Sequence, residues 1–391
     1  MNTTKLLIIA VALLVLVGGT FLVYNLFFKS SSPGDGNEPT NALPSASAGA
    51  TSLPTSGNGS VNGGQSGVAQ KIRLVSQEPV LSPAIGEDGK TVKYYTRSNG
   101  RVLESDFIGN NLKEISSVTL NGLLKALWSP DKTKTIGVFS DNNAIKKYFY
   151  DYNNNQSALL NDQVGYVAWS PDSKRIAYQF IDQTNGQHNI SVANPDGSSW
   201  KNIFKTRLDN LIVEWPSKEK ISLRQPPSGL AQGILYAINS DTGDFNKILS
   251  DLFGLNVKWS PRADKILFSS TNDRGKNPQL FLTDASGTNL KNLKLTGLAD
   301  KCVWSNDDRT IFCALPQEMS TSAVWPDDYY KGLVILADDF YKINLESDTK
   351  TKILGSSDEA SFDAQELFLS PKEDYLFFVN KHDGLLYSLK I

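Results

Sequence analysis

Five side chains that could bind a partner lie close together near the C-terminal end of the chain. They are Trp325, Asp327, Asp328, Tyr329 and Tyr330. Aromatic rings that are costly to leave in water, next to carboxylates, are typical anchors of binding surfaces. An equal alternative is that Trp325 and the tyrosines fold their own segment down onto the last structural unit of the chain. Because the two roles can coexist, the sequence predicts these five as candidate binding residues.

Residues that support catalysis or soft-metal binding are scarce. The chain has only two histidines, His188 and His382, and two cysteines, Cys302 and Cys313. A zinc site would need almost all of them together, and no G-x-S-x-G motif of a serine hydrolase occurs. Carboxylate pairs for acid–base chemistry cannot be recognised because a sequence gives no distance between them. We therefore predict no catalytic residue, no metal ligand and no cofactor.

The overall charge argues against nucleic acid as a partner. Lysine and arginine number 39 against 41 aspartate and glutamate residues, which gives a net charge of −2. A chain without an excess of positive charge has no general attraction for a phosphate backbone.

A phrase of about fourteen residues recurs along the chain, in its best form VAWSPDSKRIAYQF. Its anchoring position falls on Leu81, Trp128, Trp169, Trp215, Trp259, Trp304 and Leu369. Apart from one long step before Leu369, the spacing is near the roughly 40–45 residues of a four-stranded propeller blade. The long step reflects an insertion between the second and third strands of the sixth unit, and this insertion carries the five candidate binding residues.

Each unit reads as a small antiparallel sheet. A short apolar strand ends at the tryptophan, Ser-Pro with Asp or Lys makes a tight turn, and three further strands follow. The fourth strands include residues 198–206 and 244–250. Both strand faces are apolar, as expected where every sheet packs between two neighbours and a tryptophan fills the wedge between them.

The two ends of this region complement each other. After Leu369 only three strands remain, whereas residues 71–77 form a strand that belongs to no repeat. Pairing Ile72 and Leu74 with residues 385–391 would remove two open sheet edges. We therefore predict an all-β fold over residues 71–391: a seven-bladed β-propeller closed by an N-terminal strand.

The run from Trp169 to Tyr178, W-S-P-D-x-x-x-I-A-Y, resembles the WD40-like (PD40) repeats of TolB-like propellers. The resemblance covers residues 71–391 and implies the propeller fold. Members of this family include periplasmic scaffolding proteins and accessory domains of oligopeptidases. This chain differs in lacking the small α/β domain before the propeller and a hydrolase domain after it. Its fourth and sixth repeats also depart from the pattern, with Trp215-Pro216-Ser217 and Trp304-Ser305-Asn306.

The N-terminal region predicts attachment to a membrane. Residues 6–28 are almost wholly apolar and lie between Lys5 and Lys29, which is long enough to cross about 30 Å of hydrocarbon. A cleaved signal peptide is the alternative, but its apolar region is usually only about 7–15 residues long. We expect a transmembrane helix, a signal-anchor, over residues 1–29. Residues 30–70, rich in Ser, Gly, Asn and Pro, form a disordered linker.

Two further sets of residues leave alternatives open. Charged side chains near the starts of the first strands could position a polar ligand in the channel or neutralise one another. These are Glu78, Lys125, Glu214, Lys258, Lys301 and Glu366. Cys302 and Cys313 occupy cross-strand positions, where they could form a disulfide or pack as reduced thiols.

The sequence thus predicts a single-pass plasma (inner) membrane protein with its propeller on the extracytoplasmic side. We expect a non-catalytic binding or scaffold module for an envelope protein, peptide or glycan. The alternatives are an extracytoplasmic hydrolase or lyase acting at the channel mouth, and a structural spacer between envelope layers.

Overall fold

The structure is a computed structural model that describes residues 71–184, 186–355 and 361–391. The predicted membrane anchor and the predicted linker, residues 1–29 and 30–70, lie outside the described residues. Within the described ranges, none of the helices has the length and apolar character needed to cross a bilayer.

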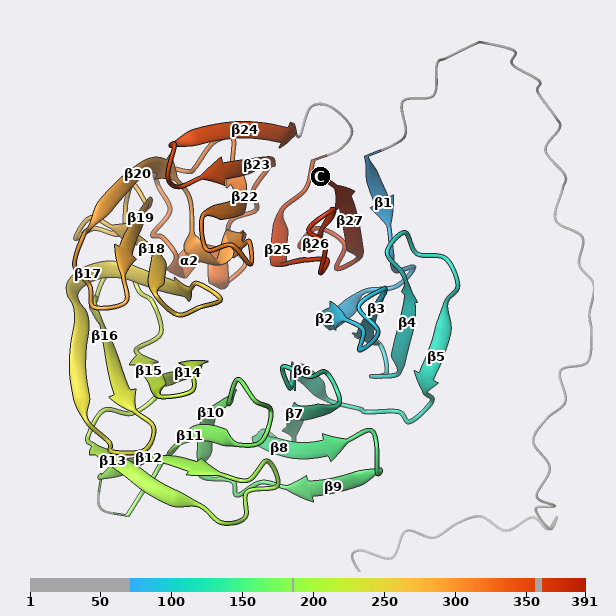
Figure 1. The fold of residues 1–391 in the computed structure, drawn as a ribbon, viewed down its shortest axis with the longest axis vertical. Coiled ribbons are helices and arrows are strands. Elements are labelled where there is room, and N and C mark those ends of the chain that lie inside the picture. The colour runs from blue at the N-terminus through green and yellow to red at the C-terminus, as the bar shows by residue number, and fades with distance from the viewer. Residues whose placement is uncertain (1–70, 185, 356–360) are drawn as a thin grey trace, which may run out of the picture. The chain divides into compact units, whose positions relative to one another are not determined.

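Residues 71–391 form seven antiparallel blades arranged as a ring (Figure 1). Blade 1 contains β2 (Val80–Ile85), β3 (Thr91–Thr96), β4 (Val102–Asp106) and β5 (Lys113–Ser116). Blade 2 contains β6 (Leu123–Trp128), β7 (Lys134–Asp141), β8 (Ala144–Asp151) and β9 (Gln156–Leu159). Blade 3 contains β10 (Val164–Trp169), β11 (Ile176–Phe180), β12 (His188–Ala193) and β13 (Lys201–Thr206).

The remaining blades follow the same order. Blade 4 contains β14 (Ile212–Ser217), β15 (Lys220–Arg224), β16 (Gln232–Asn239) and the first part of β17 (Phe245–Trp259). Blade 5 contains the rest of β17, β18 (Lys265–Thr271), β19 (Gln279–Asp284) and β20 (Lys291–Thr296). Blade 6 contains β21 (Cys302–Trp304), β22 (Thr310–Pro316), β23 (Asp338–Asn344) and β24 (Thr349–Leu354). Blade 7 contains β25 (Ala364–Leu369), β26 (Tyr375–Asn380), β27 (Leu386–Lys390) and β1 (Ile72–Leu74).

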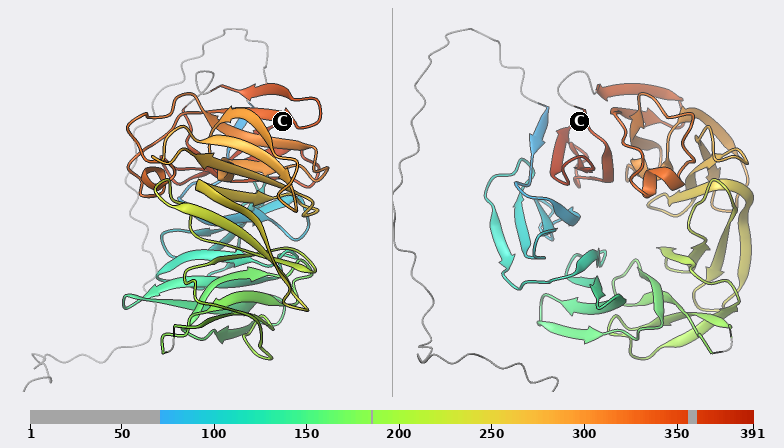
Figure 2. Two further views of the ribbon diagram at one scale, coloured as in Figure 1. Left: turned by 90° about the vertical axis from the view of Figure 1, so that its left-hand side faces the viewer. Right: turned by 180° about the vertical axis from the view of Figure 1, so that it is seen from behind.

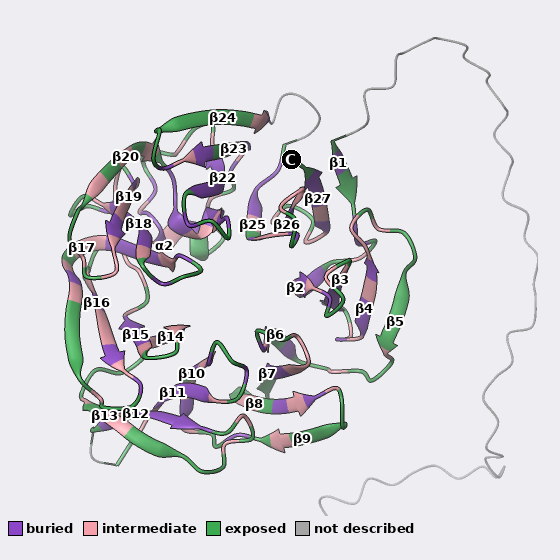
Figure 3. Ribbon diagram, in the orientation of Figure 1, coloured by how far each residue is buried: buried purple, intermediate pink, exposed green. Residues whose placement is uncertain are grey.

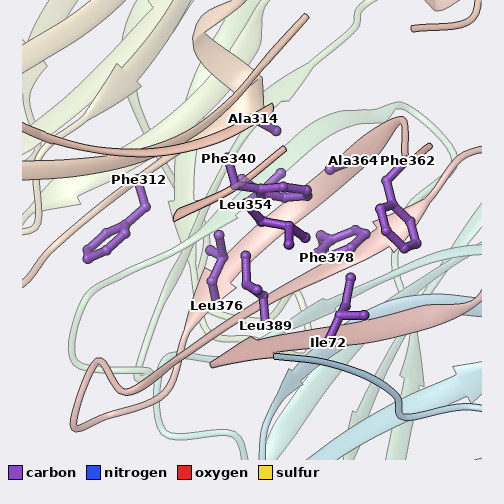
Figure 4. Close-up of a cluster of buried hydrophobic side chains, with 11 residues drawn as sticks. Ile72, Phe312, Ala314, Phe340, Leu354, Phe362, Ala364, Leu376, Phe378 and Leu389 are labelled. Carbon is purple, nitrogen blue, oxygen red and sulfur yellow. The ribbon is translucent and has the colours of Figure 1, made fainter. Parts of the chain in front are cut away.

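The ring closes as predicted, because the first described strand completes the last blade. Ile72 pairs with Leu389 and Leu74 pairs with Tyr387. Figure 4 shows Ile72 beside Leu389 and Phe378 in the core between blades 6 and 7. The pairing strand β1 is only three residues long, shorter than the predicted residues 71–77, since the chain leaves the sheet after Leu74.

One strand differs from the prediction of separate fourth and first strands. β17 runs without a break from blade 4 into blade 5, so Phe253 pairs with Gln232 on one side and with Thr271 on the other. Gly254 lies in the left-handed region with φ of 64°, and the register of β17 against β18 shifts between Phe253 and Asn256. A glycine can adopt this conformation without steric cost, so the strand changes blade while staying paired.

The hydrophobic core is divided among the junctions between blades. Seven clusters of buried side chains each combine residues of two neighbouring blades, so every junction of the ring has its own cluster. Trp169 and Ile176 of blade 3, for example, pack with Ile136 and Phe149 of blade 2. Burial therefore concentrates on the inner three strands, while outer strands such as β5 and β9 are largely exposed (Figure 3).

The repeat tryptophans also link blades by hydrogen bonds. The indole nitrogen of Trp128 donates to the Ser82 carbonyl at 2.8 Å, and that of Trp304 donates to the Lys258 carbonyl at 3.2 Å. In both cases the acceptor belongs to the preceding blade. Trp215, in the altered Trp-Pro-Ser repeat, instead donates to Lys218 of its own blade.

Candidate functional site

The insertion of blade 6 comprises residues 317–337, between β22 and β23. It contains one short helix, α2 (Asp327–Tyr330), which lies at the inner edge of the ring in Figure 1. Figure 2 shows the same helix at one face of the ring. The insertion therefore lies on the inner side of the ring, on the face formed by the loops between second and third strands.

Trp325 and Tyr329 are buried beneath the insertion. Their exposed fractions are 1% and 3%, and they form a separate small core with Leu298, Ala323 and Leu336. The Trp325 backbone N–H also donates to the Gly275 carbonyl of blade 5 at 2.8 Å. These two predicted binding residues thus hold the insertion in place from below.

The two carboxylates of α2 are both paired with protein groups. Asp327 accepts hydrogen bonds from the Ser228 hydroxyl at 2.8 Å and the Gly229 backbone N–H at 2.7 Å, both in the β15–β16 loop of blade 4. Asp328 accepts the backbone N–H of Val324 at 2.7 Å. Asp327 therefore ties the insertion to blade 4, and Asp328 fixes the start of the helix.

The insertion does not rest on blade 7 alone, as the packing alternative expected. It reaches blade 4 through Asp327 and blade 5 through Trp325, and it also meets Lys381 of blade 7, whose ammonium group donates to the Tyr329 carbonyl at 2.7 Å. The sequence could not reveal these partners, because Ser228 and Gly275 lie in unremarkable polar loops far from the insertion.

A fully buried ionic cluster lies under Tyr329. The Lys301 ammonium group is 2.8 Å from an Asp338 carboxylate oxygen and 2.7 Å from one of Asp363. The Tyr329 hydroxyl donates to Asp363 at 2.7 Å. Burial raises the pKa of Asp338 to about 6, although Lys301 acts in the opposite direction. Lys301, predicted to face the channel, is instead 1% exposed and serves this cluster.

A second polar group surrounds Tyr330, at the end of α2. The Tyr330 hydroxyl donates to Asp300 at 2.7 Å and also contacts the side-chain amide of Asn256. Burial and the Asp300 carboxylate raise the pKa of Tyr330. Nearby Arg224 is 3.7 Å from Glu214, but two of its buried nitrogens, Nε and Nη1, meet no hydrogen-bond partner among the described residues. This group therefore retains unused donors.

The other charged residues predicted at the channel are dispersed. Lys258 donates to the Cys302 carbonyl at 2.5 Å, and Glu78 pairs with Arg101. Burial raises the pKa of Glu366, while Lys125 and then Arg97 act to lower it. The structure thus places Glu214 in the group around Tyr330 and Arg224, whereas Glu78, Lys125 and Glu366 lie toward blades 1, 2 and 7.

The end of α2 and the residues that follow it expose large apolar side chains, a feature that the sequence did not predict. Leu333 and Ile335 follow α2 and are 71% and 59% exposed. Tyr330 is 45% exposed, and Leu230 in the contacted loop of blade 4 is 65% exposed. The apolar run Gly-Leu-Val-Ile-Leu at positions 332–336 is visible in the sequence, but only the structure shows which of its side chains are exposed to solvent.

Metal-binding geometry is not present in the parts of the chain that the structure describes. No group of three or more histidine, cysteine, aspartate or glutamate side chains there is arranged so that it could hold a metal ion.

Comparison with known proteins identifies the fold and no family. No family model matches the chain, and no curated protein matches its sequence. Among solved structures, it is similar to an oligogalacturonate lyase from Vibrio parahaemolyticus, with TM-score 0.56, 10% identity and coverage of 82% of this chain and 90% of that one. It is also similar to the propeller domain of the Trilobed protease from Pyrococcus furiosus, with TM-score 0.54, 10% identity and coverage of 80% and 95%.

TolB from Acinetobacter baumannii is similar at TM-score 0.44 and 15% identity, covering 72% of this chain and 63% of that one. At such low identities, the structural matches with TM-scores above 0.5 show a common fold alone. The chain is an all-β protein with the propeller fold.

Proposed function

We propose that this protein is a membrane-anchored, extracytoplasmic β-propeller that acts as a non-catalytic binding or scaffold module for an envelope protein, peptide or glycan. Of these, a protein partner bound at the blade 6 insertion fits the geometry best. The observation that supports this proposal is that Leu333 and Ile335 are exposed, whereas Trp325 and Tyr329 of the same insertion are buried. Exposed aliphatic side chains on a rigid loop are typical of protein interaction sites.

The five residues predicted from the sequence divide their roles in this proposal. Trp325, Asp327, Asp328 and Tyr329 fix the shape of the insertion through the buried core and the hydrogen bonds to blade 4. Tyr330 shares the outer surface with Leu333 and Ile335. A preorganised surface loses less conformational entropy on binding than a loop that must first become ordered.

Site-specific photo-crosslinking tests the proposal. A photo-reactive amino acid placed at position 333 of the full-length chain should crosslink one defined protein in intact cells. The same probe at position 112, where Leu112 is 52% exposed on blade 1, is the matched control. The crosslink at position 333 should disappear in an Ile335→Asp variant that melts at the wild-type temperature. Equal crosslinking from both positions would contradict the proposal.

Alanine variants separate recognition from packing within the insertion. Trp325→Ala should remove about 3–5 kcal/mol of stability because it leaves a cavity in the small core. Leu333→Ala should change stability by less than about 0.5 kcal/mol, because the side chain is exposed, yet it should weaken partner binding.

Membrane attachment is tested separately, since removing residues 1–29 should release the protein from the membrane fraction.

An enzyme acting at the channel mouth, a hydrolase or lyase, is the second candidate. The observation that favours it is the group of Tyr330, Asp300 and Arg224, in which Arg224 keeps two unpaired donors that could hold an anionic substrate. The fold is shared with an oligogalacturonate lyase at 10% identity. Turnover of an anionic oligosaccharide that is lost in Arg224→Met would place this candidate first.

A further inference from the structure

The junction between blades 2 and 3 contains a pocket of about 450 Å³, away from the insertion. Its floor is formed by buried residues including Val164, Ile176 and Tyr178, and its outer wall by Trp200. Leu160, in the connection between the two blades, closes one side. The volume lies within the roughly 300–1,000 Å³ typical of small-molecule sites.

At this pocket, blade 3 has a small residue at a position that is aromatic in four other blades. Tyr178 lies nine residues after the repeat tryptophan Trp169. Ser191 of β12 pairs with Tyr178 across the sheet. Four other blades have an equally long turn between their first and second strands. In these blades the residues that correspond to Ser191 are Tyr148, Phe281, Tyr341 and Tyr387. In blade 5, Phe281 stacks on Phe268 with ring centroids 5.2 Å apart and packs against the core of that junction.

The lining is uncharged and mostly apolar, with polar side chains at a few positions. None of its eleven residues carries a formal charge at neutral pH, yet it includes the side-chain amides of Asn161, Asn189 and Asn202. The Ser191 hydroxyl donates to the Asn202 carbonyl oxygen at 2.7 Å, which orients this amide on the wall. Such a site offers a few donors and acceptors within an apolar lining and no charge to balance an ionic ligand, so it suits a neutral molecule that has both apolar and polar surfaces.

Trp200 adds a flat aromatic surface to this lining. Trp200 directly precedes β13, and 63% of its surface is exposed. Burial of a tryptophan side chain is normally favourable. A ligand that can use both features needs one apolar face and polar groups around its edge. A sugar ring has this character, because its axial C–H groups form an apolar face and its hydroxyl groups lie around the rim.

We propose that the pocket between blades 2 and 3 binds a neutral pyranose unit of a glycan, stacked on Trp200 and hydrogen-bonded by the asparagine amides. This site is separate from the insertion, which contacts blades 4, 5 and 7. It can therefore succeed or fail independently of the function proposed above.

Protein-observed NMR titration of the full-length chain, which follows the indole N–H resonances, tests the proposal with methyl β-D-glucopyranoside and methyl N-acetyl-β-D-glucosaminide. At least one should bind, and it should shift the indole resonance of Trp200, assigned by its absence in Trp200→Phe. D-Galacturonate, which carries a negative charge, should bind more weakly. N-Acetyltryptophanamide represents the competing occupant, an aromatic side chain of a peptide.

Three variants make the test specific to the pocket. Ser191→Tyr restores the aromatic ring of the other blades and should weaken binding at least about tenfold, as should Trp200→Ala. Leu290→Ala is the matched control, because Leu290 precedes β20 in the equivalent turn of blade 5 and is 61% exposed. It should bind like the wild type.

Three outcomes would overturn the proposal. The first is that neither neutral glycoside binds, whether or not N-acetyltryptophanamide does. The second is binding that is unchanged in Ser191→Tyr, provided that this variant retains the wild-type melting temperature. The third is binding lost equally in Leu290→Ala, which would place the ligand elsewhere.

Discussion

The indole nitrogen of Trp169 donates a hydrogen bond to the backbone carbonyl of Leu127 in the preceding blade, at a distance of 2.8 Å. The recurring tryptophan therefore fills the wedge between two blades and also bonds to the neighbouring blade. Trp128 and Trp304 repeat the relationship with their own preceding blades.

Replacing Trp169 by phenylalanine should lower the free energy of unfolding by about 1–3 kcal/mol, since both a hydrogen bond and packed volume are lost. Trp215→Phe is the matched control because the Trp215 indole donates within its own blade, at 3.3 Å. Chemical denaturation should show the larger loss for Trp169→Phe. Equal losses would mean that the bond between blades stabilises the protein no more than the bond within a blade.

Closure of the ring should depend on Ile72. The variant Ile72→Asp places a carboxylate at a position that is 6% exposed between blades 6 and 7, and it should cost about 3 kcal/mol or more. Leu74→Asp, on the same short strand, changes a side chain that is 46% exposed and should cost less than about 1 kcal/mol. Thermal melts of the two variants would test this, and similar melts would argue against closure by β1.

The buried carboxyl of Asp338 should make stability depend on pH. Burial raises its pKa from the ordinary 3.8 to about 6, so the folded state holds the proton more tightly than the unfolded chain does. Its stabilising contribution is complete below pH 3.8 and is lost as the pH rises through 6. The stability of the wild type relative to Asp338→Asn should therefore fall by about 2 kcal/mol between pH 4 and pH 7.

Asp172 supplies the control with the opposite sign. A hydrogen bond from the Ser170 hydroxyl lowers the pKa of Asp172, although partial burial acts against it. Its contribution should be present above the ordinary pKa and lost as the pH falls through the lowered value. A difference between the wild type and Asp338→Asn that does not vary with pH would contradict the assignment of the slope to Asp338.

The two cysteines are joined in the structure. Cys302 and Cys313 lie directly opposite each other in β21 and β22, and their sulfurs form a disulfide. Because the bond closes a short loop, we expect it to contribute about 2–3 kcal/mol. A reducing agent should lower the melting temperature of the wild type and leave Cys302→Ala/Cys313→Ala unchanged. Two free thiols in the intact, denatured protein would contradict the bond.

Much of the architecture was predictable because each blade repeats a local solution. The tryptophan, the Ser-Pro turn and the following apolar strand recur in order, so the number of blades and the strand that closes the ring follow from the pattern. The continuous β17 was not predicted, since its polar stretch before Leu252 looks like an ordinary end of a strand. Only the pairing of Phe253 on both sides reveals its continuity.

The candidate site was harder to predict than the fold. The segment with Trp325 and Tyr329 stood out by composition, but its contacts with Ser228 and Gly275 depend on the closed ring, which brings distant loops to one face. The pocket at Ser191 has a similar origin. A serine in a strand is unremarkable until the aromatic residues at the same place in other blades show what is missing.

The unbroken β17 has a mechanical consequence. Blades 4 and 5 share β17, so tilting them apart would break hydrogen bonds that this strand makes. We therefore expect the two blades to move together as one rigid unit. Relative motions of the blades should then occur at the other junctions of the ring. The insertion bonds to blades 4 and 5 through Asp327 and Trp325 and to blade 7 through Tyr329, so motion at the junctions of blades 5, 6 and 7 would strain these contacts.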